Sequence, residues 1–450
     1  MPVLLSLFIT IVLIIVLIMK VRMNAAVAMF LGALFMGIST GLGAMETVNT
    51  LTKGFGGTMA SLGYSVGFGV MMGQMIAATG CVQSIANTLV KVFSKKRSDY
   101  ALGTTGFIVS IPVFYDVGYV VLMPLAKTLA KMSQKSIAYF SGALVLGLGL
   151  THTFVPPTPG PMTGAELLGI DIGMMILWGL IIGIPTFLIA MVINRKLLDR
   201  PGYFVPEKHM EIDEEYQKQQ RLMEEEFIKD EKTLPSFGLA ILPILTPIVL
   251  ILMGTVAKAV VGDGTVPAII TFLSDKSIAM LAGLLVSIAI ALPQMNFKKI
   301  EDEINKSLSS IGTVLFITGT GAALGAVIQA CGVGDALLKV VQGVNMPPIL
   351  FAWLVAALLK VAQGSGTVAM ITTVGMMAPM MAGITTSPVL VALAAFSGTL
   401  MGAHVNDSAF WITAKISNLN TSGGFRVYSI PCAINAVVSL ALIFIASIFI

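Results

Sequence analysis

Long apolar runs, rather than an apolar stripe at every third or fourth position, dominate this chain. A helix needs about 20 apolar residues to cross the hydrocarbon core of a bilayer, and many of the runs approach that length. They predict helices surrounded by lipid rather than by water. The runs cover residues 4–19, 25–42, 137–150, 172–193, 239–257, 278–292, 389–401 and 430–450.

The runs and the breaks between them predict ten membrane spans in two groups of five. Each group also holds a segment that enters and leaves the membrane on one side, at residues 101–130 and 348–382. The predicted spans cover residues 2–19, 24–44, 54–80, 137–162 and 173–193 in the first group, and 236–257, 277–293, 304–332, 390–413 and 428–450 in the second.

Two stretches that lie 252 residues apart match each other. His152 recurs at this offset as His404, and both lie outside the charged middle of the chain. Many secondary transporters build one substrate site between two such halves, so the match predicts a transporter. The other matching pairs are Gly67 and Gly319, Gly69 and Gly321, Gly73 and Gly325, Ile76 and Ile328, Ala78 and Ala330, and Gly80 and Gly332.

Composition agrees with an integral membrane protein. Apolar residues make up 56% of the chain and charged residues 11%, and the mean hydropathy is +0.92. A water-soluble surface needs more charge than this, so membrane lipids are expected around the protein and nucleic acid is not an expected partner. Cys81, Cys331 and Cys432 match neither a metal-binding nor a disulfide spacing, and no cofactor is predicted.

The positive charges predict an orientation, because Lys and Arg concentrate on the cytoplasmic side of membrane proteins. Lys20 and Arg22 follow the first run and mark it as a retained span rather than a cleaved signal. Further basic clusters lie at 91–97, 127–135 and 195–200. Placing all of them in the cytoplasm gives the first half an odd number of crossings and puts both termini outside.

A charged segment divides the chain into two membrane units. Residues 195–235, with acidic runs at 211–215 and 224–226, predict a cytoplasmic linker between an N-terminal repeat at 1–194 and a C-terminal repeat at 236–450. The loop at 46–53 is predicted to face outward, whereas Lys298 and Lys299 are predicted to lie in a cytoplasmic loop. The two repeats are therefore predicted to be inverted about an axis in the membrane plane.

Polar residues interrupt the apolar pattern twice in the first half. Asp116 follows Pro112 in the first non-crossing segment, and a carboxylate at the membrane centre costs about 2.5–3.5 kcal/mol on insertion scales, so it should face protein or a water-filled cavity. The segment 151–161 contains four prolines within six residues and cannot stay helical. Unwound backbone and half-helix ends there would offer N–H groups to an anionic or hydroxylated ligand.

Two matching interruptions occur in the second half. Residues 363–367 place Ser365 and Thr367 at the tip of the second non-crossing segment. Lys360, just before it, could be a counter-charge to a carboxylate substrate or to Asp116, or could extend to the membrane interface. Residues 402–411 bring an imidazole, an amide, a carboxylate and a hydroxyl close together. A buried histidine is usually structural, but two at matching positions in helix breaks also suggest a functional role.

Four segments in the same order resemble the signature segments of the gluconate permease (GntP) family. They are FYDVG at 114–118, THTFVPPTPGP at 151–161, GSGTVA at 364–369 and AHVNDSAFW at 403–411. The likeness runs over essentially the whole chain, including MPVLL at 1–5 and PSFG at 235–238.

The resemblance implies a bacterial inner-membrane symporter that couples proton entry to uptake of gluconate or a related small hydroxy acid. It also implies an elevator movement of two re-entrant hairpin tips and two broken helices around one site. Some gluconate carriers have Glu at the position of Asp116, His at that of Thr158 and SHVNDPGFW in place of AHVNDSAFW, so D-serine, glycerate and other sugar acids remain open as substrates. A homodimer also remains open, because Ala143, Gly147 and Gly149 could pack within or between subunits.

The expected fold is an all-α membrane protein of two inverted repeats, each with a re-entrant hairpin and a broken helix. Charge and resemblance together define the candidate site within it. Asp116 or Asp407 would take up the proton, and Lys360 or a protonated histidine would supply positive charge. The candidate substrate-binding residues are Tyr115, Asp116, Gly118, Thr151, His152, Thr158, Gly364, Ser365, Gly366, Thr367, His404, Asn406 and Asp407.

Two other functional classes fit parts of this pattern. A sodium-coupled carrier or a sodium–proton exchanger could use the same inverted repeats and buried carboxylates. An intramembrane enzyme could use His152, His404 and Asp407 as acid–base groups, but neither an HExxH metal motif nor a GxSxG nucleophile motif accompanies them.

Overall fold

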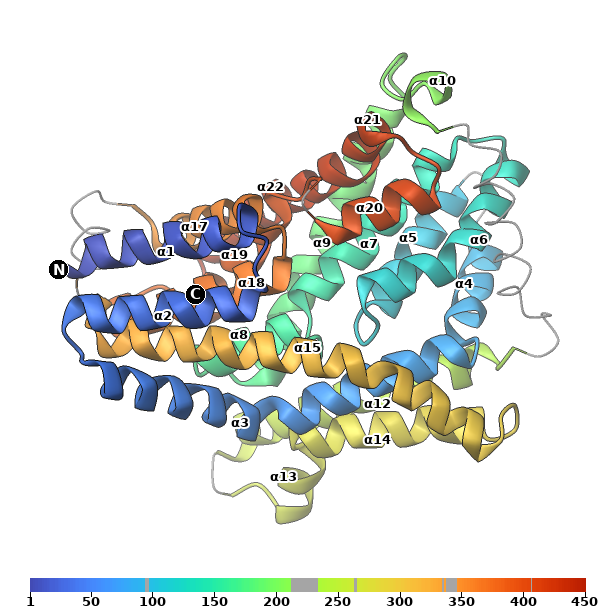
Figure 1. The fold of residues 1–450 in the computed structure, drawn as a ribbon. Helices are drawn as coiled ribbons and strands as arrows, with labels where there is room; N and C mark the ends of the chain where they lie inside the picture. Colours follow the sequence, from blue (N-terminus) through green and yellow to red (C-terminus); the bar gives the residue numbers. More distant parts are fainter. Residues whose placement is uncertain (94–96, 212–233, 263–264, 334–335, 337–345, 406) are drawn as a thin grey trace.

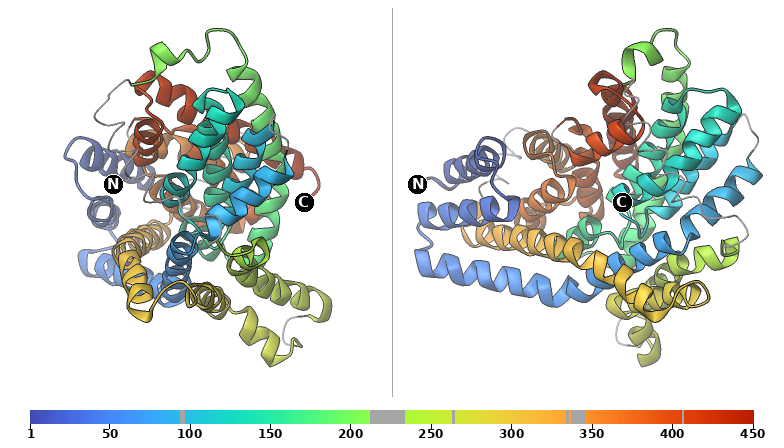
Figure 2. Two further views of the ribbon diagram at one scale, coloured as in Figure 1. Left: turned by 90° about the vertical axis from the view of Figure 1, so that its right-hand side faces the viewer. Right: turned by 45° about the vertical axis from the view of Figure 1, so that its right-hand side comes forward.

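The first half of the chain folds into helices, with a break at residues 155–158 inside the predicted proline-rich segment. The computed structural model describes residues 1–93, 97–211, 234–262, 265–333, 336, 346–405 and 407–450 (Figures 1 and 2). The helices of the first half are α1 (Val3–Met19), α2 (Ala25–Thr40), α3 (Ala44–Ala78), α4 (Cys81–Val92), α5 (Ser98–Val109), α6 (Tyr115–Ser133), α7 (Ile137–Phe154), α8 (Pro159–Leu167) and α9 (Ile172–Leu198), followed by the short α10 (Pro206–His209).

The second half repeats this order of elements. Each half contains a short helix pair joined by a tight turn, which is α5–α6 in the first half and α17–α18 in the second. Each half then contains a helix with a central break, which is α7–α8 in the first half and α19–α20 in the second. The helices of the second half are α12 (Phe237–Val261), α13 (Ala268–Ser274), α14 (Lys276–Ala291), α15 (Phe297–Ala330), α17 (Pro348–Gln363), α18 (Gly366–Met377), α19 (Pro388–Met401), α20 (Ser408–Ile416), α21 (Thr421–Gly424) and α22 (Ile430–Ala446), with the 3₁₀ turn η3 (Ala378–Gly383) and the π turn η4 (Phe425–Ser429).

By length and composition, five helices of the described residues can cross a membrane, when α7–α8 and α21–η4–α22 are each counted as one. The number rises to seven if each of two bent pairs is also one span. The bends are 62° between α3 and α4 and 65° between α13 and α14. Three predicted boundaries are wrong. The expected loop at 46–53 belongs to α3, Lys298 and Lys299 belong to α15, and Thr151 and His152 still lie in α7, because the break begins only at residue 155.

The long helices α3 and α15 run side by side along one edge of the molecule (Figures 1 and 2). The matched glycines on them permit close approach to the helix pairs. A Cβ on Gly73 would lie 2.7 Å from the Pro112 carbonyl oxygen, in the turn between α5 and α6. A Cβ on Gly325 would lie 3.1 Å from the Cα of Gly375 in α18. Each long helix therefore supports the helix pair of its own half.

The two halves interlock through their broken helices. Helix α8 of the first half packs against α18 of the second, and α20 of the second half packs against α6 of the first. Buried hydroxyls join the second of these contacts, because Tyr115 and Thr413 share a hydrogen bond of 2.6 Å and Tyr119 and Ser417 one of 2.7 Å. The polar interruptions of both halves thus meet in one region.

The start of the predicted linker lies against the end of α20. An isolated bridge pairs Met210 with Leu419, the N–H of Asn420 donates to the His209 carbonyl, and α10 and α21 lie together (Figure 1). Residues 212–233, which hold most of the acidic runs, lie outside the described residues.

Gly147 packs within the subunit, which was one of the two arrangements open from sequence. A Cβ there would lie 2.7 Å from the Phe107 nitrogen and would also overlap the Gly103 carbonyl, so α5 and α7 are in backbone contact. We expect Gly147→Ala to lower the free energy of unfolding by about 1–3 kcal/mol through overpacking. Thermal unfolding of the detergent-purified protein would measure this loss. Gly149→Ala is the matched control, since its Cβ would meet nothing within 4 Å, and equal effects of the two changes would contradict the prediction.

Candidate functional site

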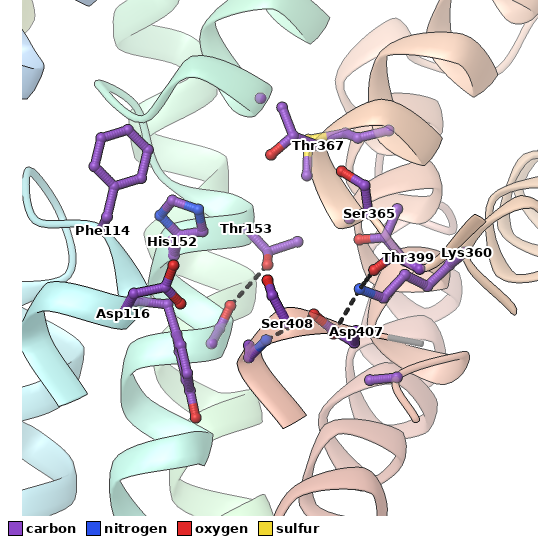
Figure 3. Close-up of a pocket in the computed structure, with 18 of the residues that line it drawn as sticks. Phe114, Asp116, His152, Thr153, Lys360, Ser365, Thr367, Thr399, Asp407 and Ser408 are labelled. Atoms are coloured by element: carbon purple, nitrogen blue, oxygen red, sulfur yellow. Dashed lines mark hydrogen bonds and ion pairs between the residues drawn. The ribbon is translucent and has the colours of Figure 1, made fainter. Parts of the chain in front are cut away.

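A cavity of about 650 Å³ lies where the interruptions of both halves meet (Figure 3). Its walls come from α6, α7, α8, α15, α17, α18, α19, α20 and α22, so both halves contribute. Nine of the candidate residues line it, namely Tyr115, Asp116, His152, Lys360, Gly364, Ser365, Gly366, Thr367 and Asp407.

Four helices begin at this cavity. The N-terminal turns of α6, α8, α18 and α20 contribute Tyr115, Gly160, Gly366 and Ser408 to its lining. Gly364 ends α17 with a φ of 79°, a conformation that favours glycine and allows α18 to begin two residues later. Helix N-termini carry a partial positive charge and free N–H groups. Their convergence makes the cavity suited to an anionic group.

Lys360 and Asp407 form an ion pair at one wall. The Lys360 Nζ lies 2.6 Å from Asp407 Oδ2, and the two side chains are 5% and 9% exposed. Lys360 also donates to the Gly364 carbonyl at 2.7 Å, and the Tyr428 hydroxyl donates to Asp407 Oδ2 at 2.6 Å. The other Asp407 oxygen accepts from the Ala409 N–H and caps α20. The pairing with Asp116 that the sequence left open is therefore not present in this structure.

Asp116 faces the cavity from the first turn of α6. Asp116 is exposed, and none of the described residues forms a hydrogen bond or an ion pair with its carboxylate. In Figure 3 it lies on the wall opposite Lys360 and below His152. With Asp407 neutralised by Lys360, Asp116 is the carboxylate of the described cavity wall that has no compensating cation.

The two matched histidines occupy different surroundings. His152 lines the cavity, its ring centroid lies 5.5 Å from that of Phe114, and its buried Nδ1 has no hydrogen-bond partner among the described residues. The Nε2 of His404 lies 3.2 Å from the Val361 carbonyl, and His404 is not part of the cavity lining. Only the first of the pair is placed to contact a ligand.

Several predicted residues shape the site without lining it. Gly118 packs against Leu148, and Thr151 is buried in α7. The Thr158 hydroxyl donates to the His152 carbonyl at 2.8 Å and to the Val155 carbonyl at 3.0 Å, which stabilises the break between α7 and α8. Asn406 lies outside the described residues.

Sequence reasoning missed much of the hydroxyl lining and one partner of Asp407. Thr153 and Ser408 stood within the quoted motifs but were not selected. Ser309 and Thr313 lie four residues apart on α15, a spacing that places them on one helix face and made them detectable as a polar pair. Tyr428 lies in neither a quoted motif nor a polar helix face, so the sequence did not single it out. The missed polar residues of the lining are Thr153, Ser309, Thr313, Thr399, Ser408 and Tyr428.

A sequence profile of GntP family permeases matches residues 1–449. The chain belongs to this family. It is 35% identical to an uncharacterized permease of Haemophilus influenzae (95% of this chain, 89% of the relative) and 33% identical to the high-affinity gluconate transporter of Escherichia coli (93% of each). It is 31% identical to the D-serine transporter DsdX of Escherichia coli (98% of this chain, 97% of the relative).

The family and its relatives are permeases, so this GntP family protein is a multi-pass membrane transporter and not an enzyme. Its fold is similar to MtrF of Neisseria gonorrhoeae, with a TM-score of 0.66 and 14% identity over 91% of this chain and 85% of MtrF. The YdaH transporter of Alcanivorax borkumensis is similar with a TM-score of 0.64 and 14% identity over 94% and 98% of the two chains. At this identity the likeness concerns the fold alone.

Proposed function

We propose that the protein imports gluconate or a related small hydroxy acid together with a proton. The observation that carries the proposal is the unpaired Asp116 carboxylate in a cavity where four helix N-termini meet. Relatives named as gluconate and L-idonate transporters, at 33% and 31% identity, support a sugar acid as the substrate.

The formal charges of the cavity explain why a proton would accompany the substrate. Lys360 cancels Asp407, so the ionised Asp116 leaves one net negative charge. A substrate carboxylate in the same cavity would be repelled by that charge. A proton on Asp116 removes the repulsion, and the helix N-termini then favour the anion. The loaded and the empty site carry the same net charge, so a monoanion and one proton cross without moving net charge.

The hydroxyl groups of the lining would recognise the polyol part of the substrate. Ser365 and Thr367 lie at the start of α18, and Thr153 and Ser408 come from α7 and α20. Each hydroxyl can donate one hydrogen bond and accept others, which suits a chain of substrate hydroxyls. His152 adds a ring with an unsatisfied nitrogen on the same side as Asp116.

The proposed movement is an elevator. The helix pairs and broken helices would move as one unit in which the halves interlock through α8 with α18 and α20 with α6. The proposed setting is the bacterial inner membrane, with two inverted repeats at 1–194 and 236–450, both termini outside and the linker at 195–235 in the cytoplasm.

A hydroxy amino acid is a second candidate substrate, favoured by the same unpaired carboxylate. An ammonium group could pair with ionised Asp116 and take the place of the proton, while the substrate carboxylate binds at the helix N-termini. The likeness to a D-serine transporter at 31% identity supports keeping this candidate.

Uptake of labelled gluconate into right-side-out vesicles under an inward proton gradient tests the proposal. We expect accumulation that a protonophore abolishes and that sodium does not change, with competition by idonate and other sugar acids. Competition by D-serine alone would favour the hydroxy amino acid. Uptake that requires sodium would overturn the proton coupling, and no uptake of any of these acids would overturn the proposed substrate class.

A further inference from the structure

A cluster of polar side chains joins three helices beyond the cavity, at the end of α8. The Lys276 Nζ of α14 donates to the Ser61 Oγ of α3 and to Glu166 Oε2 of α8, both at 2.7 Å. The Ser61 hydroxyl in turn donates to the second oxygen of Glu166. Three helices are thus joined by one polar cluster, which we call the α8 latch (Ser61, Glu166 and Lys276).

An apolar layer separates this latch from the cavity. This layer, which we call the plug, consists of the buried residues Leu62, Val66, Val70, Met162 and Ile311. Two residues of the cavity wall, Phe114 and Val314, pack against it. Met162 lies one helical turn before Glu166 on α8, a rise of about 6 Å. A ligand in the cavity would therefore meet first an apolar plug and then the latch.

The corresponding face of the second half borders a surface hollow. Trp411 and Lys415 are the fourth and eighth residues of α20, as Met162 and Glu166 are of α8. They line a surface hollow of about 570 Å³ together with Ile412 and Ile416, and Trp411 is 41% exposed. The two broken helices therefore differ in their described surroundings, although they hold matching places in the chain.

The long helices show the same asymmetry. Ser61 and Leu62 of α3 correspond, at the 252-residue offset, to Thr313 and Val314 of α15. On α15 these positions line the open cavity, whereas on α3 they belong to the latch and the plug. Matching positions of the two long helices thus line the cavity in the second half and form the latch and the plug in the first half.

We propose that the α8 latch and the plug close a second access route, and that Gly57, Ser61 and Leu62 line this route when it opens. Gly57 corresponds to Ser309 of the cavity lining. In the alternate state Thr313 of α15 and the Trp411–Lys415 face of α20 close on each other, while α8 leaves α3 and α14. The inference rests on the proposed transport function, because transport requires two conformations in which the site opens to opposite sides of the membrane.

Thiol accessibility tests the gate without any substrate. In a background with Cys81, Cys331 and Cys432 replaced by Ser, Leu62→Cys should react slowly with a membrane-impermeant maleimide, and Thr313→Cys should react fast. Adding Glu166→Gln breaks the latch, and we expect it to accelerate labelling of Leu62→Cys about two- to fivefold, the range for a partly exposed ion pair. Labelling of Thr313→Cys should slow at the same time, which a local loosening would not cause.

Lys306→Gln is the matched control, because it breaks the exposed Lys306–Glu303 pair on α15 and should change neither rate. Equal labelling of Leu62→Cys and Thr313→Cys, or faster labelling of both on adding Glu166→Gln, would overturn the gate.

Cross-linking connects the gate to transport. A short reducible reagent that joins Ser61→Cys to Glu166→Cys should abolish uptake of labelled gluconate, and reduction should restore it to the rate measured before cross-linking, whereas uptake by each single-cysteine variant should not change when the reagent is added. Undiminished uptake by the cross-linked protein would refute the gate. If the wild-type protein takes up none of the tested acids, the proposed substrate class fails, and the labelling rates still decide the gate.

Discussion

Asp116→Asn abolishes proton-driven accumulation and preserves exchange of substrate, if Asp116 carries the symported proton. Asparagine is close in size to aspartate but cannot titrate, so the substrate carboxylate would bind without a proton. A pH gradient of one unit supports about tenfold accumulation of a monoanion at one proton per substrate. We expect the accumulation ratio of the variant to fall to about one.

Vesicles that contain unlabelled substrate measure the second half of this prediction. Exchange of internal for external substrate needs no net proton movement, so Asp116→Asn should retain it and should lose its dependence on external pH. Asp116→Glu is the matched control, since it keeps a titratable carboxylate and should still accumulate substrate. Wild-type accumulation in Asp116→Asn would disprove the role of Asp116 as proton carrier.

Lys360→Met should be the most destabilising single substitution around the cavity. It leaves Asp407 buried with the Tyr428 hydroxyl and the Ala409 N–H but without a cation. Removing one partner of a buried ion pair typically costs about 3–5 kcal/mol. We therefore expect a clear drop in the temperature of unfolding in detergent and loss of uptake.

The double variant Lys360→Met with Asp407→Asn separates the ion pair from simple loss of packing. It removes both charges, so it should recover part of the stability that Lys360→Met loses, and the difference gives the coupling between the two residues. Tyr428→Phe should cost less, about 1.5–3 kcal/mol, because it removes one hydrogen bond to a charged group. Additive losses in the double variant would mean that the pair is not energetically coupled.

Local chemistry made the helix breaks predictable from sequence. Proline removes a helix hydrogen bond and disfavours a helical conformation in the residue before it, and the adjacent prolines at 156 and 157 lie in the break between α7 and α8. The polar residues of the breaks could likewise be assigned to one cavity, because a charge in an apolar span has to face protein or water.

The division of roles within those breaks depended on the three-dimensional fold. Lys360 and Asp407 are separated by 47 residues, and sequence could not choose between Asp407, Asp116 and a substrate as the partner of the lysine. His152 and His404 looked equivalent by position, yet only one lines the cavity. Thr158 resembled a ligand-binding hydroxyl, whereas its hydrogen bonds to two nearby carbonyls show a local structural role.

The interlocking of the halves has a consequence for how such a protein can change over evolutionary time. Each broken helix packs against the helix pair of the other half, so neither half encloses a complete site, and what a ligand meets is the sum of both. The two halves can then differ in charge: one carries a lone carboxylate at Asp116, and the other a neutral pair of Lys360 and Asp407. Because selection acts on the combined charge of the cavity, a change of substrate can arise from a substitution in either half while the other half stays unchanged.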